Sequence, residues 1–263
     1  MLGSTKEFNP QPVRRDAIFL LVKEKGMVSV ADLSKKFGVT TMTIRRDLQY
    51  LEQDGLIERI HGGAVVTKSG VREPLFTQKR LLHRAEKEVI AIAAAALVDD
   101  YDTIFLNSGT TTLRMLRRIV ANHVKIVTNN AYFPVDDMPD NYEIISTGGT
   151  FRKESYTLIG DTALHTLSQV FASKAFIGVD GFDWENGMTT PVQSEAHVNR
   201  TMIAHTRGKV IVVADSSKIG AVSNFFVAPV VAAHMLITDS RITDMDRKRF
   251  EEAGIEVIVC EAH

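Results

Sequence analysis

Residues 28–65 read VSVADLSKKFGVTTMTIRRDLQYLEQDGLIERIHGGAV, and this stretch decides the fold of the first part of the chain. Its apolar residues recur at the three- and four-residue spacing of amphipathic helices. They are Val30, Leu33, Phe37, Ile44, Leu48 and Leu51. Gly38 ends the first predicted helix and leaves a very short turn before the second, which runs from about Thr41 to Asp54. This order of helix, short turn and helix predicts a helix-turn-helix unit.

The flanking segments extend this unit on both sides. An apolar stripe over residues 18–22 predicts an earlier helix, which Gly26 can end. The Gly62-Gly63 pair lies between two short strand-like runs, which indicates a β-hairpin. Three helices followed by a hairpin predict a winged helix-turn-helix domain over residues 13–66.

The outward face of the helix that begins near Thr41 carries the chemistry of base recognition. On a helical wheel, the side opposite Ile44 presents Arg45, Arg46 and Gln49. Arginine pairs with two acceptors of guanine and glutamine pairs with adenine, whereas hydroxyls and free N–H groups at a helix start suit phosphate. The residues expected to contact double-stranded DNA are Ser29, Thr40, Thr41, Met42, Thr43, Arg45, Arg46, Gln49, Arg59, His61 and Gly62.

A simpler interpretation of Arg45 and Arg46 is that they are solvated or paired with an acid such as Asp47. The charge distribution favours DNA. Residues 1–84 hold 15 Lys and Arg against 9 Asp and Glu, a net charge of +6, whereas residues 85–263 carry −7. A basic first third indicates a module for a polyanion attached to a second domain.

Composition excludes several other classes of protein. The chain has 263 residues, 44% hydrophobic and 24% charged, as is usual for a globular protein. Its single cysteine, Cys260, excludes an intramolecular disulfide and fits a reducing cytoplasm. The longest apolar run, Val89 to Val98, is shorter than the roughly 18 residues that span a bilayer. Neither a metal-binding histidine motif nor a phosphate-binding P-loop is present, so we expect a cytoplasmic protein without metal or cofactor.

From residue 85 onward, strand-like and helix-like segments alternate, which indicates an α/β domain with a mostly parallel sheet. The predicted strands cover residues 103–106, 125–128, 142–146, 174–179, 209–214, 235–238 and 255–259. The predicted helices cover residues 86–98, 113–120, 157–170, 194–206 and 243–253. Residues 67–84 lack clean periodicity and are predicted to be a linker, which leaves 85–263 as the second domain.

Polar residues follow several of these strands, at the edge where open α/β sheets bind ligands. Residues 107–112, NSGTTT, join a strand to a helix and offer hydroxyls and backbone N–H groups to a phosphate. An ordinary Ser/Thr helix cap explains the same residues equally well, and both alternatives stay open. Glu195 has a simpler role too, as a partner for its helix dipole.

The motifs T-I-R-R-D-L, L-E-x-x-G and H-G-G-A resemble the DeoR family of bacterial transcriptional regulators, and further matches extend this resemblance over about residues 13–260. Those matches include D-T-I-F-L-N-S-G-T-T, T-N-N, I-G-V-D-G and A-D-S-S-K-I-G. The resemblance implies that Thr41, Thr43, Arg45 and Arg46 read or clamp DNA. It also implies a C-terminal domain that resembles the ribose-5-phosphate isomerase and CoA-transferase folds and senses a phosphorylated sugar or sugar alcohol.

Carried over by motif, the resemblance assigns the effector-binding residues. Those implied for the phosphate are Asn107, Ser108, Gly109, Thr110, Thr111 and Lys218. Those implied for the sugar are Asn129, Gly149, Arg152, Asp180 and Glu195. Two features depart from the family pattern: Asn107 stands where an acidic residue is common, and residues 99–102 replace a glycine-containing turn.

The predicted function is a repressor of a carbohydrate-utilisation operon, working as a homodimer or a higher even homo-oligomer. One recognition helix reads too few base pairs for genomic specificity, so two copies are needed. The alternative is a sugar-phosphate isomerase or deaminase fused to a DNA-binding module. Deaminase relatives carry a histidine after their Asp-Gly, whereas Phe182 follows Gly181 here and cannot transfer protons. We therefore expect no catalytic residue.

Overall fold

The computed structural model describes residues 10–53, 56–66, 75–133 and 140–262. The chain divides into two compact units, Met1–Arg72 and Glu73–His263.

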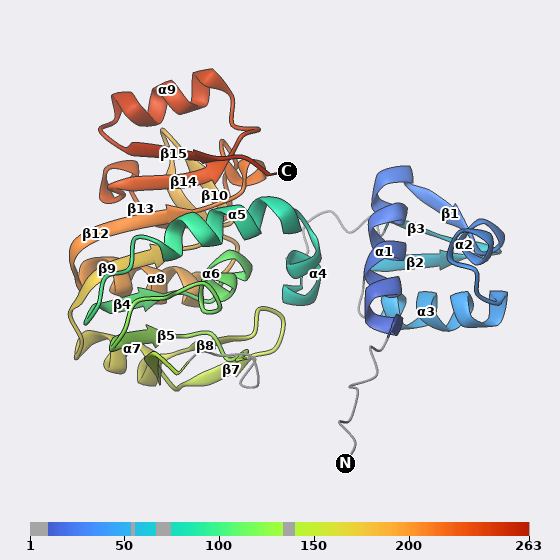
Figure 1. Cartoon of the computed structure of the whole chain (residues 1–263), viewed down its shortest axis with the longest axis horizontal. Helices are drawn as coiled ribbons and strands as arrows, with labels where there is room; N and C mark the ends of the chain where they lie inside the picture. The colour runs from blue at the N-terminus through green and yellow to red at the C-terminus, as the bar shows by residue number, and fades with distance from the viewer. Residues whose placement is uncertain (1–9, 54–55, 67–74, 134–139, 263) are drawn as a thin grey trace, which may run out of the picture. The chain divides into compact units, whose positions relative to one another are not determined.

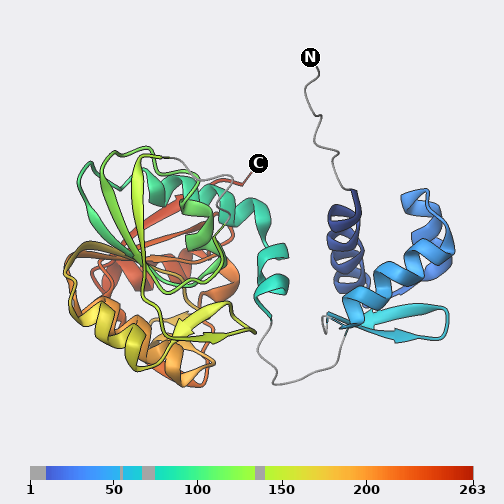
Figure 2. The same ribbon diagram turned by 90° about the horizontal axis from the view of Figure 1, so that it is seen from below.

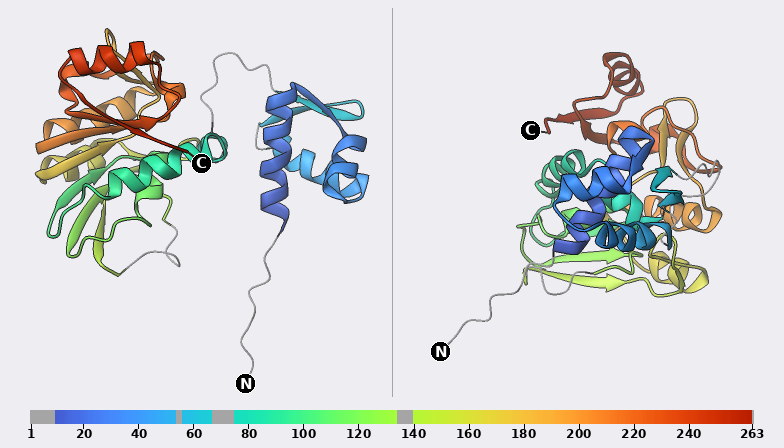
Figure 3. Two further views of the ribbon diagram at one scale, coloured as in Figure 1. Left: turned by 45° about the horizontal axis from the view of Figure 1, so that its top comes forward. Right: turned by 90° about the vertical axis from the view of Figure 1, so that its right-hand side faces the viewer.

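The first unit is the predicted winged helix-turn-helix (Figure 3). Its elements are α1 (Pro10–Lys25), β1 (Met27–Ser29), α2 (Val30–Phe37), α3 (Thr41–Gln53), β2 (Ile57–Ile60) and β3 (Gly63–Val66). Gly26 and Gly38 end α1 and α2 in the left-handed region, at φ 73° and 63°. The strand β1 was not predicted. It pairs with β3 and widens the hairpin to an antiparallel sheet of order β1-β3-β2.

The second unit is built on a parallel sheet of order β15-β14-β12-β9-β4-β5-β6 (Figure 1). The seven predicted strands all occur in it, with small shifts at their ends. They are β4 (Thr103–Leu106), β5 (Val124–Thr128), β6 (Tyr142–Ser146), β9 (Ala172–Ile177), β12 (Thr206–Val213), β14 (Met235–Asp239) and β15 (Glu256–Cys260). Because every neighbouring pair is parallel, the carboxyl ends of all seven strands lie along one edge.

Helices cover both faces of this sheet (Figure 2). They are α5 (Arg84–Ala95), α6 (Thr110–Met115), α7 (Asp161–Ser168), α8 (Gln193–Ala204) and α9 (Asp244–Glu252). Along β4, Ile104 and Leu106 pack with α5 and α6, whereas Phe105 packs with α7 and α8. Such alternation buries the strands on both sides, as a parallel sheet requires.

Two small antiparallel arrangements add to the predicted architecture. One is the hairpin of β7 (Thr150–Arg152) and β8 (Thr157–Ile159), and the other has the order β10-β11-β13. The strands of the latter are β10 (Gly181–Asp183), β11 (Gly187–Thr190) and β13 (Phe225–Ala228). The prediction of helix from residue 157 is therefore wrong at its start. Leu158 N donates to Asn129 O at 2.7 Å, and α7 begins only after Gly160, whose φ is 90°.

The predicted linker is also shorter than 67–84. Residues 67–74 lie outside the described residues, but α4 (Phe76–Leu81) and the start of α5 belong to the second unit. Phe76 is 3% exposed and its ring packs 5.9 Å from that of Tyr132 and 5.3 Å from that of Tyr156. Phe76 is the buried aromatic side chain that anchors the start of this segment, and one buried residue leaves no periodic pattern in the sequence.

Among the residues that the structure describes, none of the helices combines the length and the apolar character that crossing a bilayer requires.

Phe182 supplies a test of the core of the second unit. Its side chain is fully buried and stacks on Phe250, with the ring centroids 4.6 Å apart. Phe182→Ala is expected to lower the free energy of unfolding by about 3–5 kcal/mol, because the lost burial adds to the cost of a cavity. Urea denaturation of the full chain measures this. Phe171→Ala, at a half-exposed aromatic, is the control, and equal losses in both variants would contradict this packing.

Candidate DNA interface and effector site

Helix α3 faces solvent with the side that was predicted to read DNA. Ile44, Leu48 and Leu51 are at most 3% exposed, which fixes the opposite side of the helix outward. The exposed residues on that side are Met42, Arg45, Arg46 and Gln49, and Thr41 is exposed at the start of the helix. The outward face therefore presents two guanidinium groups, an amide and a thioether, as its helical periodicity predicts.

Asp47 excludes one interpretation of the arginine pair, in which this carboxylate neutralises it. Its carboxylate is 2% exposed and accepts from Arg14 Nε at 2.6 Å and Arg15 Nε at 3.1 Å, both on α1. The interpretation that Asp47 neutralises Arg45 or Arg46 is therefore wrong. Within the described part of the chain, neither arginine has an ion-pair partner. Asp47 instead ties α1 to α3 and leaves both arginines available to a polyanion.

The hydroxyls predicted to contact DNA divide into two groups. Ser29 caps α2, since its hydroxyl accepts from Asp32 N at 3.0 Å and lies 2.7 Å from the Asp32 carboxylate. Thr40 caps α3, where its Oγ1 accepts from Thr43 N at 3.2 Å and lies 3.0 Å from the Thr43 hydroxyl. The Thr41 side chain is exposed. The caps shape the helix starts, and Thr41 offers a hydroxyl beside them.

A groove of about 500 Å³ separates α3 from the β2–β3 hairpin, and Arg45, Arg59 and His61 are among its lining residues. Arg59 Nε lies 2.8 Å from Glu52 Oε2, so part of its charge is already balanced by α3. His61 and Gly62 form the exposed turn of the hairpin, and Gly62 has φ 82°. The hairpin thus brings cationic and polar groups beside the outward face of α3.

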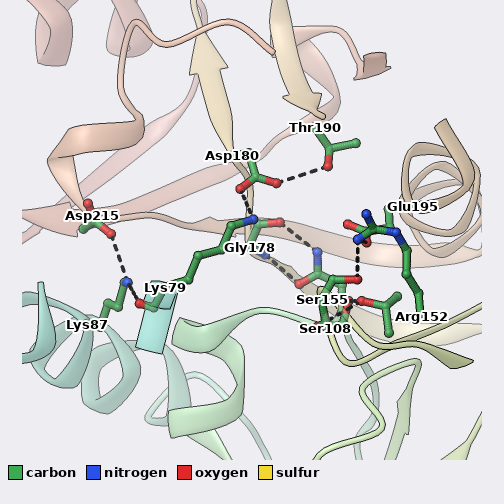
Figure 4. A network of polar contacts seen from close by, with 12 residues as sticks. Lys79, Lys87, Ser108, Arg152, Ser155, Gly178, Asp180, Thr190, Glu195 and Asp215 are labelled. Carbon is green, nitrogen blue, oxygen red and sulfur yellow. Dashed lines mark hydrogen bonds and ion pairs between the residues drawn. The ribbon is translucent and has the colours of Figure 1, made fainter. Parts of the chain in front are cut away.

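In the second unit, the candidate effector site lies at the carboxyl edge of the parallel sheet (Figure 4). Asn107 follows β4 there and joins this strand to β9. Its Nδ2 donates to Gly178 O at 2.7 Å and to Asn199 Oδ1 at 3.0 Å, and its Oδ1 accepts from Gly178 N at 2.8 Å. A carboxylate cannot donate two of these bonds, which explains the departure from the acidic residue at this position. Asn107 therefore organises the edge, and its own polar atoms are already hydrogen-bonded.

The predicted phosphate cradle forms a connected turn. Ser108 N donates to Asn129 Oδ1 at 2.9 Å, and Ser108 Oγ lies 2.8 Å from Thr157 Oγ1 on β8. Thr110 and Thr111 are buried at the start of α6. This arrangement joins the ends of β4 and β5 to the β7–β8 hairpin. The helix-cap interpretation is partly right, because Thr112 Oγ1 accepts from Gly109 N at 3.0 Å.

Acids and cations alternate along the same edge. Lys79 Nζ donates to Asp180 Oδ1 at 2.6 Å, and Thr190 Oγ1 donates to Asp180 Oδ2 at 3.1 Å. Burial alone would raise the pKa of Asp180, but Lys79 and then Lys218 stabilise its carboxylate, and the pKa lies below its ordinary value. Asp180 is therefore a charged acceptor whose Oδ1 already bonds Lys79 and whose Oδ2 already bonds Thr190.

Arg152 and Glu195 form a second acid–cation pair. Arg152 Nη1 lies 3.4 Å from Glu195 Oε1 and donates to Ser155 Oγ at 3.0 Å. Glu195 and Asn199 lie one turn apart on α8, so the helix that bonds Asn107 also carries this carboxylate. Gly149 has φ 108°, and a Cβ on it would meet Ile159 O at 2.5 Å. Its requirement for glycine thus comes from packing against β8.

Lys87 is a functional residue that sequence reasoning missed. It is 4% exposed, and its Nζ donates to Lys79 O at 2.6 Å and Leu82 O at 2.8 Å. Burial lowers the pKa of Lys87 to about 8, and nearby cations such as Lys218 add to the effect. The Asp215 carboxylate, 3.8 Å from Lys87 Nζ, acts in the opposite direction on this pKa. Among the described residues, Asp215 Oδ2 has no hydrogen-bond partner. A visible signal exists: Lys87 shares a helical stripe with the apolar residues at 90, 91 and 94.

Lys79 and Asn199 were also missed, and neither had a signal. Lys79 lies in the segment that was predicted to be a linker, and Asn199 is a polar residue in the middle of a helix. Both enter the site through contacts between distant parts of the sequence: Lys79 bonds Asp180 across 101 positions, and Asn199 bonds Asn107 across 92. In contrast, Phe182 lies in the core, stacked on Phe250, away from these polar groups.

Two domains of a known protein family match this chain. Residues 82–240 match the DeoR C terminal sensor domain, and residues 14–70 match the DeoR-like helix-turn-helix domain. The chain belongs to the DeoR family. Helix α4 of this DeoR-family chain lies between the two matched ranges, which is why motifs did not reveal Lys79.

Individual proteins agree with the family assignment. The HTH-type transcriptional regulator GlpR of Haloferax volcanii is 34% identical over 246 residues, which cover 93% of this chain and 96% of that protein. The putative aga operon transcriptional repressor of Escherichia coli O157:H7 is 34% identical over 94% of this chain and 93% of its own length. This DeoR-family chain is thus similar along most of its length to proteins named as regulators of transcription.

A partial structural overlap is found with the ribose 5-phosphate isomerase of Plasmodium falciparum. It covers 51% of this chain and 52% of that chain, with a TM-score of 0.35 and 15% identity.

The buried Lys87 generates a prediction for the pH dependence of stability. Between about pH 8 and the ordinary lysine pKa of 10.5, the unfolded chain binds a proton at Lys87 that the folded chain has lost. The free energy of unfolding should therefore rise through this window, relative to Lys87→Met, by up to about 3 kcal/mol. Urea denaturation at several pH values measures it. The exposed Lys209→Met is the control, and a difference between wild type and Lys87→Met that does not change with pH would refute the burial of Lys87.

Proposed function

We propose that this DeoR-family protein is a repressor of a carbohydrate-utilisation operon. A phosphorylated sugar or sugar alcohol binds it and either releases it from operator DNA or tightens its binding to that DNA. The observation that carries the proposal is the convergence of four cations on the carboxyl edge of the sheet. They are Lys79, Lys87, Arg152 and Lys218. Three of these cations already face a carboxylate, Asp180, Asp215 or Glu195, and a phosphate competes with these carboxylates because it carries more negative charge than any one of them.

The remaining groups of the site suit a sugar. The hydroxyl of Ser108 and the backbone at the start of α6 are donors beside the cations. Asp180 and Glu195 are carboxylates, which accept hydrogen bonds from ligand hydroxyls. We infer that the site binds its ligand without converting it. Lys79 neutralises Asp180, and Phe182, at the position where deaminases carry a histidine, is buried in the core.

In the first unit, the exposed face of α3 supports recognition of operator DNA. Arg45 and Arg46 stay free of Asp47, and the α3–hairpin groove adds Arg59 and His61. We propose that two or more copies bind one operator, because a single α3 contacts too few base pairs for specificity.

Arg45→Ala tests the DNA interface. It should weaken operator binding by about 1–3 kcal/mol and relax base preference, since one guanidinium leaves the outward face. Fluorescence anisotropy of a labelled duplex from the gene's upstream region, or from a selected binding site, measures the affinity. Arg247→Ala on α9, with the same charge change in the other unit, is the control. Unchanged affinity in Arg45→Ala, or wild-type affinity that does not fall with rising salt, would argue against the interface.

Lys218→Ala tests the effector site. The variant should keep wild-type operator affinity and lose the response to sugar phosphates, because the phosphate loses a cation that lies close to Asp180 and Lys87. A panel of pentose, hexose and glycerol phosphates is titrated into the protein–DNA complex and followed by anisotropy. Lys209→Ala, at an exposed lysine within β12, is the matched control. A normal response in Lys218→Ala would rule out its role, and turnover of any panel member would favour an enzyme.

A further inference from the structure

Lys79 is contributed to the effector site by α4, the first helix of the second unit. Its ammonium lies 2.6 Å from Asp180 Oδ1, and both side chains are only about one-fifth exposed, at 19% and 21%. Lys79, which lies outside the sequence motifs, therefore already occupies part of the site that those motifs assign. In Figure 4, Lys79 extends from its backbone to Asp180 while Lys87 bonds its carbonyl.

Helix α4 has six residues, too few to be stable by itself, so its position depends on what holds it. One end is held by Phe76, whose N donates to Glu154 O at 2.7 Å and whose ring contacts Tyr156. The other end is held by Lys87, which bonds the carbonyls of Lys79 and Leu82. Between these ends, the Lys79 side chain bonds Asp180, and Arg114 Nη2 donates to Arg80 O at 3.4 Å.

Of these attachments, the Lys79–Asp180 pair is the one that a ligand can change directly. A sugar phosphate carries between one and two negative charges at neutral pH, against the single charge of Asp180. Asp180 is also the carboxylate that sugar hydroxyls would approach. Ligand binding therefore offers each partner of the ion pair an alternative partner.

We propose that Lys79 contacts the effector, a proposal that rests on the proposed function. The anionic group of the effector replaces Asp180 as the partner of the Lys79 ammonium, and this loosens α4. The chain that joins the two units enters the second unit at α4. A change in α4 is thus a change at the junction with the DNA-binding unit. The ligand shifts the equilibrium between the paired and separated states of Lys79 and Asp180, because it binds more tightly when Lys79 has left Asp180.

The first experiment needs no ligand. Hydrogen–deuterium exchange on the full chain follows the backbone amides of residues 77–83. Lys79→Met and Asp180→Asn should each speed their exchange by about tenfold, because either change removes the same attachment. Two variants from different elements keep the test valid if one folds poorly.

Lys174→Met is the matched control. Lys174 is similarly buried, at 17% exposure, and lies 2.6 Å from both Asp99 and Asp102 at the opposite end of β9. Its loss also removes a half-buried ion pair but should leave exchange in α4 unchanged. If Lys79→Met and Asp180→Asn leave the exchange at the wild-type rate, or no faster than in Lys174→Met, the proposal is overturned.

The second experiment adds inorganic phosphate, with sodium chloride at equal ionic strength as the control. Phosphate should speed exchange of residues 77–83 in the wild type and have no further effect on them in Lys79→Met. Slower exchange in the wild type would overturn the proposal. If neither phosphate nor a sugar phosphate raises the melting temperature of the wild type, the proposed function fails, whereas the ligand-free comparison still decides whether Lys79 and Asp180 hold α4.

Discussion

The side-chain amide of Asn107 joins two adjacent strands, β4 and β9, at the edge of the sheet where the candidate effector-binding groups of the second unit lie. It bonds both backbone groups of Gly178 and the amide of Asn199, and so links β4, β9 and α8 with three hydrogen bonds. The amide is 3% exposed, and an unmet donor there would cost about 1–3 kcal/mol. The positions of Ser108 after β4, Asp180 after β9 and Glu195 on α8 all depend on this joint.

Ion pairs in the two units have opposite consequences for the charges that bind ligands. In the first unit, buried Asp47 pairs with Arg14 and Arg15 and leaves the arginines of α3 exposed. In the second unit, Asp180 pairs with Lys79, a cation of the site itself. The outward face of α3 therefore keeps its charge available, whereas the carboxyl edge of the sheet balances part of its charge within the protein.

The buried lysine Lys87 connects the chemistry of the site to the fold. A lysine that is 4% exposed is costly unless its ammonium is hydrogen-bonded, and here the acceptors are two carbonyls at the end of α4. The same ammonium lies 3.8 Å from Asp215 at the end of β12. Lys87 thus holds α4 against the sheet and adds positive potential beside Lys218.

The sequence by itself determined the elements whose signals are local. Helical spacing in residues 28–65 predicted α2, α3 and the outward face with Arg45 and Arg46, and apolar runs predicted all seven strands of the parallel sheet. Tertiary structure alone decided the pairing of Asp47 with α1, the addition of β1 and β8 to sheets, and the entry of Lys79 and Asn199 into the site. The physical reason is the separation along the sequence over which each kind of interaction acts. Periodicity and turn residues act over a few positions along the chain, whereas an ion pair or an amide bond joins whichever groups the packed core brings within about 3 Å of each other.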